Sequence, residues 1–581
     1  MVTDTPKKMV LAFLVTHFKL MSPEMEIQLS ILERLIHDNG HSLAQLATVT
    51  RQWQYVIERH NFERIKLTLW RMPEFNSMTR RNRALVKSIW VSLELEKYDC
   101  PMCDGRLRDP RRCNHTAGSC TIIKAMHDLF WNLSAWDSSQ PEKRLALDIS
   151  IYSPSDSEHY FKYLTFGPDT PSHDQKLASS NQLDDHKHGW IAGKPHFAPP
   201  RKALEYVHRE FLDKTSCIFW DEENEMRWWQ SLPEAPVVSS ILFRLQNRRR
   251  FTPTTLKCMF SRLPNLETIH YEPWRCWSLD DEAVTDQANC SLLESLTSYN
   301  GNLRKLVLFE NFDEQYSLRS LGTSNIRTTN RSLGRAVARA SLKLQHLSAS
   351  FIIEADHFFH AAESEPAWHW PHLRSLTLTS RLFSAKGNRQ SINQMLLEAA
   401  SVASKMPKLE TFEIWNGQVE SAAHFRFQVS DRYKAVLSWK SNWEHAIPAH
   451  VAKAWEAVAH AHGKADSRFV AEFSVDDTIR INSHADAINY LKLFKVLRPV
   501  SLQQILAAHT ARDKGLPQRL GLTRTPGHPN ATSKRYIRSP ISGNQWAKAM
   551  TYYRKVQEEY YTIPAHEDYI LNKFNHMQRP E

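Results

Sequence analysis

Apolar side chains recur along most of this chain at spacings that predict short strands alternating with helices. The spacing apolar-x-x-apolar-x-apolar occurs six times, in copies that begin 28, 37, 41, 29 and 36 residues apart. In each copy the last two apolar positions alternate, as on the buried face of a strand. The copies begin at Val238, Leu266, Leu303, Leu344, Leu373 and Leu409. Helical apolar spacing at 392–402 predicts a connecting helix before the last copy.

A near-duplicate nonapeptide supports an internal repeat. Residues 261–269 (SRLPNLETI) match residues 404–412 (SKMPKLETF) class by class. Repeats of this length, each a strand followed by a helix, are typical of a leucine-rich-repeat solenoid. Alternating residues at 145–152, and apolar positions at 62–67 and 86–91, predict earlier strands. We therefore expect an α/β (α+β) fold in which residues 61–416 form an irregular leucine-rich-repeat-like solenoid, interrupted by a polar loop at 167–200.

The C-terminal third departs from the repeat. Strand patterns at 425–427, 436–437 and 469–475 and a helical stripe at 451–459 predict an α/β cap over 417–510. Residues 511–581 hold 12 Lys and Arg against 6 Asp and Glu, so this tail carries +6 of the net charge of +11. We expect the tail to be partly disordered, with one helix at 546–561. Residues 1–19 are expected to be an N-terminal extension.

Residues 20–60 predict three short helices. Ile27, Ile31, Leu32 and Leu35 have helical spacing, and the sequence HDNG at 37–40 ends that helix. A short second helix and a third helix with Trp53 on its apolar stripe follow. Helices of this size cannot bury all their apolar positions by themselves, so a partner or the solenoid should complete the face.

This segment resembles an F-box, a domain whose pattern is Leu-Pro-x-Glu-Ile, a helical apolar stripe, and then leucine, valine and tryptophan. Met21 and Ser22 stand where the family has its first leucine, and one extra residue follows Pro23. The resemblance extends to filamentous-fungal F-box proteins through residues 47–54, 152–159 and 496–502. It implies binding to a Skp-type adaptor through Pro23, Ile27, Ile31, Leu32, Leu35, Leu46, Val49 and Trp53.

The resemblance implies a substrate-recognition adaptor of an SCF-type cullin–RING ubiquitin ligase, in which the repeats bind an unknown protein substrate. Gly-x-Ser-x-Gly, Gly-x-x-x-x-Gly-Lys-[Ser/Thr], Gly-x-Gly-x-x-Gly and His-Glu-x-x-His motifs are absent, and the chain has 16 glycines. We therefore expect no enzymatic activity and no cofactor. The alternative is a stand-alone leucine-rich-repeat interaction scaffold whose N-terminal helices are a cap.

The cysteines allow a second kind of site, a metal site. Eight cysteines are too few for a disulfide framework, but Cys100, Cys103, Cys113 and Cys120 cluster. A Cys-x-x-Cys pair is the usual first half of a zinc site, whereas Cys113 and Cys120 do not form a second pair. Small core residues or surface thiols are the alternative interpretation, and the one we expect.

Charge and hydropathy limit the remaining partners. The run of three arginines at 248–250 is expected in a solvated loop, because it is not interleaved with stacking aromatics as in a nucleic-acid module. The apolar run at 9–15 is shorter than a membrane-spanning helix requires. We expect neither nucleic acid nor a membrane as partner, and a cytoplasmic and/or nuclear location.

Overall fold

The computed structural model describes one of the chain's two compact units, Met1–Leu516, and no residue of the other, Pro517–Glu581. The described residues are 27, 30–32, 34, 43 and 46–513, with gaps at 101–114, 137–143, 170–183, 197–198, 209, 212–220, 276–278, 300, 314–326, 328–329, 432–433 and 463–467. The predicted extension at 1–19 and most of the basic tail, with its predicted helix, lie outside these residues.

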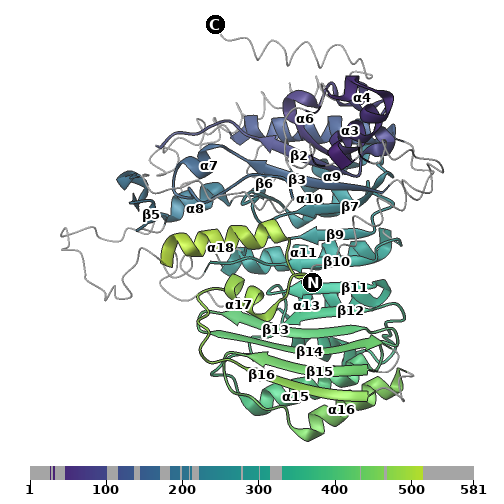
Figure 1. The fold of residues 1–581 in the computed structure, drawn as a ribbon, viewed down its shortest axis with the longest axis vertical. Helices are drawn as coiled ribbons and strands as arrows, with labels where there is room; N and C mark the ends of the chain where they lie inside the picture. The colour runs from purple at the N-terminus through teal and green to yellow at the C-terminus, as the bar shows by residue number, and fades with distance from the viewer. Residues whose placement is uncertain are drawn as a thin grey trace, which may run out of the picture. The chain divides into compact units, whose positions relative to one another are not determined.

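A 12-stranded sheet organises the chain (Figure 1). Neighbouring strands pair in parallel except at β13–β14 and β14–β15, which are antiparallel. The strands lie side by side in chain order: β1 Arg64–Thr68, β2 Ser88–Glu94, β3 Leu145–Tyr152, β7 Val238–Phe243, β9 Thr268–Tyr271, β10 Lys305–Phe309, β11 His346–Ser350, β12 Ser375–Thr379, β13 Thr411–Gln418, β14 Ser421–Asp431, β15 Lys434–Ser441 and β16 Arg468–Val475. The prediction of a mixed α/β fold is confirmed.

Each strand predicted from the repeat is present, and the repeat positions face one another across the sheet. Ile269 pairs with Leu306, Leu306 with Leu347, and Leu347 with Leu376. These four side chains are no more than 1% exposed and belong to one core. Because alternate side chains point to opposite faces, the pairing places all of them on the same face of the sheet.

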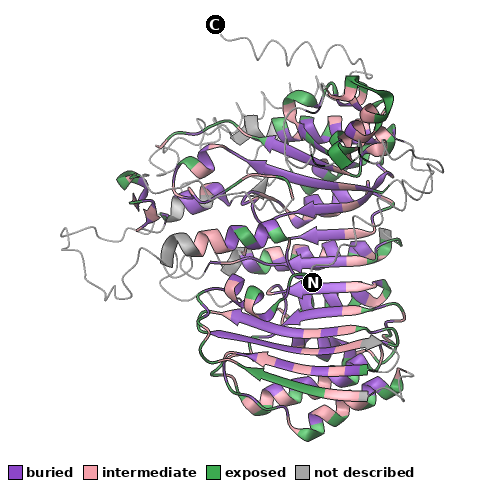
Figure 2. Ribbon diagram, in the orientation of Figure 1, coloured by how far each residue is buried: buried purple, intermediate pink, exposed green. Residues whose placement is uncertain are grey.

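Helices cover that apolar face and follow the strands in order (Figure 1). Their buried positions have helical spacing, as on α13, where Leu333, Val337 and Ala340 are buried after Asn330 caps the first turn. The helices of this layer are α6 His115–Ser134, α9 Glu222–Ser231, α10 Pro253–Phe260, α11 Leu279–Tyr299, α13 Arg331–Ala340, α14 Ala355–Ser364, α15 Arg389–Ala403 and α16 Ala449–Ala461. Figure 2 shows the strands buried along much of their length.

The opposite face of the sheet is partly covered by α17 His484–Leu491 and α18 Pro499–Asp513 (Figure 1). A second core forms there from α17, Trp415 and Phe309, together with residues between β3 and β7. Gly417 permits the close approach, because a Cβ built on it would lie 2.4 Å from the Cβ of Ala487.

The predicted cap at 417–510 continues the same sheet. β13 spans the predicted boundary between residues 416 and 417. β14, β15 and β16 extend the sheet, and α16 packs on the face that the other helices cover. The predicted strands and the 451–459 helix are all present.

The predicted loop at 167–200 contains short ordered elements: η5 His186–His188, β4 Trp190–Ile191 and β5 Lys194–Pro195. The remaining short elements are η1 Leu46–Thr48, α3 Arg51–Glu63, η2 Leu69–Arg71, α4 Phe75–Thr79, η3 Arg83–Leu85, α7 Ser155–Glu158, α8 Arg201–Val207, β6 Glu210–Phe211, β8 Arg250–Phe251 and η6 Ser341–Lys343. Within the described part of the chain, no helix combines the length and apolarity needed to cross a bilayer.

Candidate functional site

The N-terminal segment has a small core of its own. Leu32, Leu43 and Ile57 are buried together, and half-buried Leu46 and Trp53 pack against them. The Thr50 hydroxyl caps α3 by accepting a hydrogen bond from the Trp53 backbone N–H at 3.2 Å. The third helix predicted from the stripe at Trp53 is therefore present, and its apolar side faces the segment's interior.

Three of the predicted adaptor-binding residues are left open to solvent. Ile27 is 60% exposed, Ile31 50% and Val49 58%. Leu32 is buried, and Leu46 and Trp53 are half-buried in the segment's own core. Pro23 and Leu35 lie outside the described residues. The predicted set thus divides into residues that hold the segment together and residues available to a partner.

Polar contacts join α3 to the segment just before β2. Lys87 Nζ lies 2.8 Å from Glu63 Oε1, and the Lys87 backbone N–H donates to the Glu63 carbonyl at 2.9 Å. Glu58 pairs with Arg81 and accepts a bond from Gln54 at 2.9 Å. These contacts attach the segment through α3 and leave Ile27, Ile31 and Val49 exposed.

A polar row crosses the sheet on the face opposite the helices. Its members are half-buried first residues of strands, paired in register across β9–β13: Thr268, Lys305, His346, Ser375 and Thr411. Burial lowers the pKa of Lys305, and Arg498 and Lys495 lower it further. Burial likewise lowers the pKa of His346, with Lys305 adding to the effect. The row therefore holds one cation, Lys305, which lies within the electrostatic influence of Arg498 and Lys495.

An acidic group lies further along the same face. Glu413 accepts a hydrogen bond from the Thr377 hydroxyl at 2.9 Å and lies 3.5 Å from nitrogen atoms of both His424 and Arg426. Burial opposes its ionisation, but the contacts with His424, Thr377 and Arg426 lower its pKa overall. The face therefore offers both signs of charge within a polar surface.

The predicted cysteine cluster is only partly described, and Cys100 meets two residues that were not predicted. Cys103 and Cys113 lie outside the described residues, and Cys120 lies in α6 with its side chain undescribed. Cys100 Sγ is 3.6 Å from His188 Nε2 and 3.9 Å from His159 Nδ1. Both histidines stand in segments quoted above, 152–159 and 167–200. They lie 59 and 88 residues from Cys100 in the sequence, so local spacing could not predict that the three side chains meet.

The expectation of a solvated loop at 248–250 is wrong. Arg248 and Arg249 are each 3% exposed. Arg249 forms an ion pair with buried Asp156, and Arg248 stacks over the rings of Phe161 and Trp274. A buried cation needs a partner. Arg249 has the Asp156 carboxylate, and Arg248 has the faces of two aromatic rings. These two charges are therefore committed to internal contacts.

Comparison with family models identifies part of the chain. Residues 298–498 match a family of unknown function, DUF6546. The matched stretch runs from the end of α11 to beyond α17 and contains most of the polar row, whereas the N-terminal segment and Cys100 lie before it. A search of the curated proteins found no match.

Proposed function

We propose that this chain is the substrate-recognition subunit of an SCF-type cullin–RING ubiquitin ligase. The N-terminal segment would bind a Skp-type adaptor, and the polar face of the sheet would bind a protein substrate. The observation that carries the proposal is the exposure of Ile27, Ile31 and Val49 in a segment that resembles an F-box. Ubiquitin transfer would then follow from proximity, with the chemistry performed by other subunits.

The division within the segment fits an adaptor-binding role. Leu32, Leu43 and Ile57 stabilise the segment without a partner. Fully burying an Ile or Val side chain contributes roughly 1.5–3 kcal/mol, so covering a side chain that is about half exposed contributes about 1–2 kcal/mol. Each tenfold in affinity corresponds to about 1.4 kcal/mol, so these residues can account for several orders of magnitude in binding.

The sheet supports the finer assignment of a leucine-rich-repeat-like solenoid. Consecutive strands are neighbours, and helices connect them on one face. In the last five units the first apolar residue, such as Leu303 or Leu373, is buried just before the strand begins. Each unit therefore packs mainly on its neighbours, which is the organisation expected of a repeat array. The polar row lies on the face that such arrays use for binding.

The proposal is tested by substituting the exposed residues. Ile31→Asp combined with Val49→Asp removes two exposed apolar contacts and places two carboxylates against an apolar partner surface. We expect the dissociation constant for a recombinant Skp-type adaptor, measured by isothermal titration calorimetry with the full chain, to rise at least about 30-fold. Thermal unfolding should be little changed, because neither side chain belongs to the segment's core.

The matched control is Val284→Asp, an equally apolar residue on α11 that is 71% exposed. It should leave adaptor affinity unchanged. Equal affinity of the Ile31/Val49 variant and the wild type would overturn the adaptor assignment. Failure of the wild-type chain to bind the adaptor at all would favour the stand-alone repeat scaffold.

A further inference from the structure

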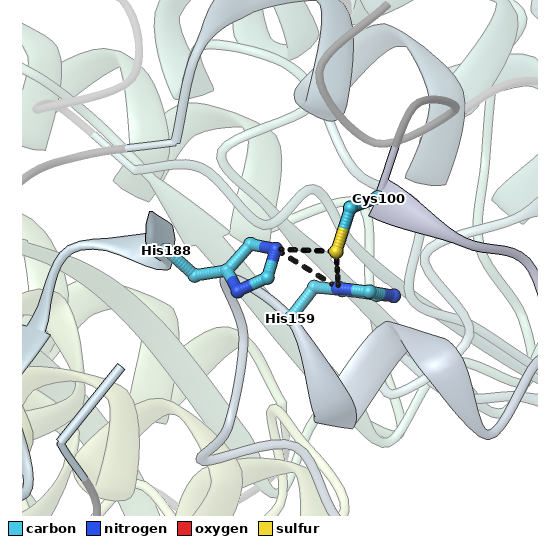
Figure 3. Close-up of side chains that lie close together, drawn as sticks. All are labelled: Cys100, His159 and His188. Carbon is cyan, nitrogen blue, oxygen red and sulfur yellow. Dashed lines mark hydrogen bonds between the residues drawn. The ribbon is translucent and has the colours of Figure 1, made fainter. Parts of the chain in front are cut away.

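Three potential metal ligands from separate segments converge on one point (Figure 3). Cys100 follows β2, His159 follows β3 at the end of α7, and His188 lies in η5. β2 and β3 are paired in parallel, so their carboxyl ends meet at the same edge of the sheet. The sheet therefore brings Cys100 and His159 together, and the insertion after them supplies His188.

The distances fit one tetrahedral ion. Cys100 Sγ lies 3.6 and 3.9 Å from the facing nitrogens of His188 and His159, and those two nitrogens are 3.0 Å apart. With zinc–sulfur and zinc–nitrogen bonds of about 2.3 and 2.0–2.1 Å, tetrahedral ligands are separated by about 3.6 Å (sulfur to nitrogen) and about 3.3 Å (nitrogen to nitrogen). Shifts of a few tenths of an ångström would bring all three atoms to these separations.

Outer hydrogen bonds orient both imidazoles. His188 Nδ1 lies 2.7 Å from Asp185 Oδ2, and His159 Nε2 lies 3.2 Å from the Tyr98 backbone carbonyl oxygen. A carboxylate and a carbonyl can only accept, so the proton of each ring belongs on these outer nitrogens. Histidines that bind metals nearly always donate their other N–H to such a group. Lys162 Nζ, 2.9 Å from the same Asp185 oxygen, completes the support.

The inner nitrogens are then both lone-pair donors facing each other. His188 Nε2 and His159 Nδ1 are 3.0 Å apart, and their residues are 5% and 8% exposed. Two lone pairs at this distance repel each other unless a cation lies between them or one ring takes a second proton. A metal ion satisfies both nitrogens and the sulfur at once.

We propose that Cys100, His159 and His188 bind a Zn²⁺ ion. Thiolate with imidazole is a ligand set that suits zinc, and the fourth tetrahedral position would be taken by solvent. The role is structural. The ion joins the small β4–β5 hairpin, whose turn residues Ala192 and Gly193 have φ of 49° and 72°, to the ends of β2 and β3.

The test measures metal in the full-length chain. Purified wild-type protein, incubated with Zn²⁺ and desalted, should contain about one zinc per chain by plasma mass spectrometry. Cys100→Ser and His188→Ala should each reduce zinc to background. Asp185→Asn should keep zinc but weaken its affinity about 10- to 100-fold in a competitive chelator titration, since it removes the outer carboxylate. Co²⁺ should give an absorption band from thiolate ligation that Cys100→Ser loses.

Cys258→Ser is the matched control. Cys258 is buried in α10, and burial together with Glu225 raises the pKa of its thiol to about 11, so this variant should retain zinc. Wild-type protein provides a second readout that does not depend on variant folding, because bound zinc should protect Cys100 from iodoacetamide. Wild-type protein that takes up neither Zn²⁺ nor Co²⁺, and whose Cys100 is alkylated equally fast with and without Zn²⁺, would overturn the proposal in favour of a reactive thiol beside two histidines.

Discussion

Replacing Arg249 by methionine should destabilise the protein far more than the loss of a solvent-exposed ion pair would. Arg249 Nη2 lies 2.8 Å from Asp156 Oδ1, and a second contact reaches the other carboxylate oxygen. The two side chains are 3% and 2% exposed. Removing the arginine leaves a buried carboxylate without its counter-charge, which costs about 3–5 kcal/mol of unfolding free energy.

Other contacts to Asp156 do not replace the lost charge. The Tyr98 hydroxyl donates to Oδ1 at 3.0 Å, and the Ser153 backbone N–H donates to Oδ2 at 2.9 Å. Burial and the adjacent Asp156 carboxylate raise the pKa of Tyr98, so its hydroxyl stays protonated and continues to donate. Both remaining partners are neutral, and they lessen the desolvation of the carboxylate without cancelling its charge.

Urea unfolding followed by circular dichroism would measure the effect. The control is Arg227→Met, which breaks an ion pair with Glu223 on α9 in which both side chains are 65% exposed. That pair is an i,i+4 helical contact worth about 0.3–0.5 kcal/mol. A double-mutant cycle with Asp156→Asn should give a coupling energy of about 1–3 kcal/mol. Equal losses for Arg249→Met and Arg227→Met, or a coupling energy near zero, would refute the reasoning.

Two further predictions concern α17. Gly417→Ala should weaken the docking of α17 by about 1–3 kcal/mol, because the new methyl group would lie 2.4 Å from the Cβ of Ala487. Adding Ala487→Gly should restore most of the stability measured by urea unfolding. A double variant whose loss is the sum of the two single losses would contradict this. Burial lowers the pKa of His484 to about 3, with His509 and Arg275 adding to the shift and Asp313 opposing it. Between about pH 6 and pH 4 His484 is therefore protonated in the unfolded chain but not in the native chain, and this histidine alone should lower stability by about 1.4 kcal/mol per pH unit on acidification. His484→Gln should remove that part of the slope, and an unchanged slope would show that other groups carry it.

The strands could be predicted because their signal is local. Leu376 and Leu378 alternate with the polar residues Ser375, Thr377 and Thr379, and the same two-residue spacing separates Leu306 from Leu308. A period of two specifies a buried strand face whichever strands become neighbours. The order of the strands also follows the chain, so repetition predicted the neighbours as well.

The candidate sites could be predicted only in part. The apolar stripe of the N-terminal segment is visible in the sequence, but its division into buried Leu32 and exposed Ile31 is set by how the segment packs on α3. Arg249 was misread because its partner Asp156 is 93 residues away. A run of arginines has the same local pattern in solvent and in a buried ion pair, and only the partner distinguishes the two.

The sequence by itself therefore determined the strands of the repeat, the covering helices at 392–402 and 451–459 and the apolar face between them, because each follows from periodicity over a few residues. Tertiary structure decided which polar groups meet. Cys100, His159 and His188 come together because β2 and β3 are parallel neighbours and because a hairpin folds back over their ends. Such a meeting depends on the path of the whole chain, and no local spacing encodes it.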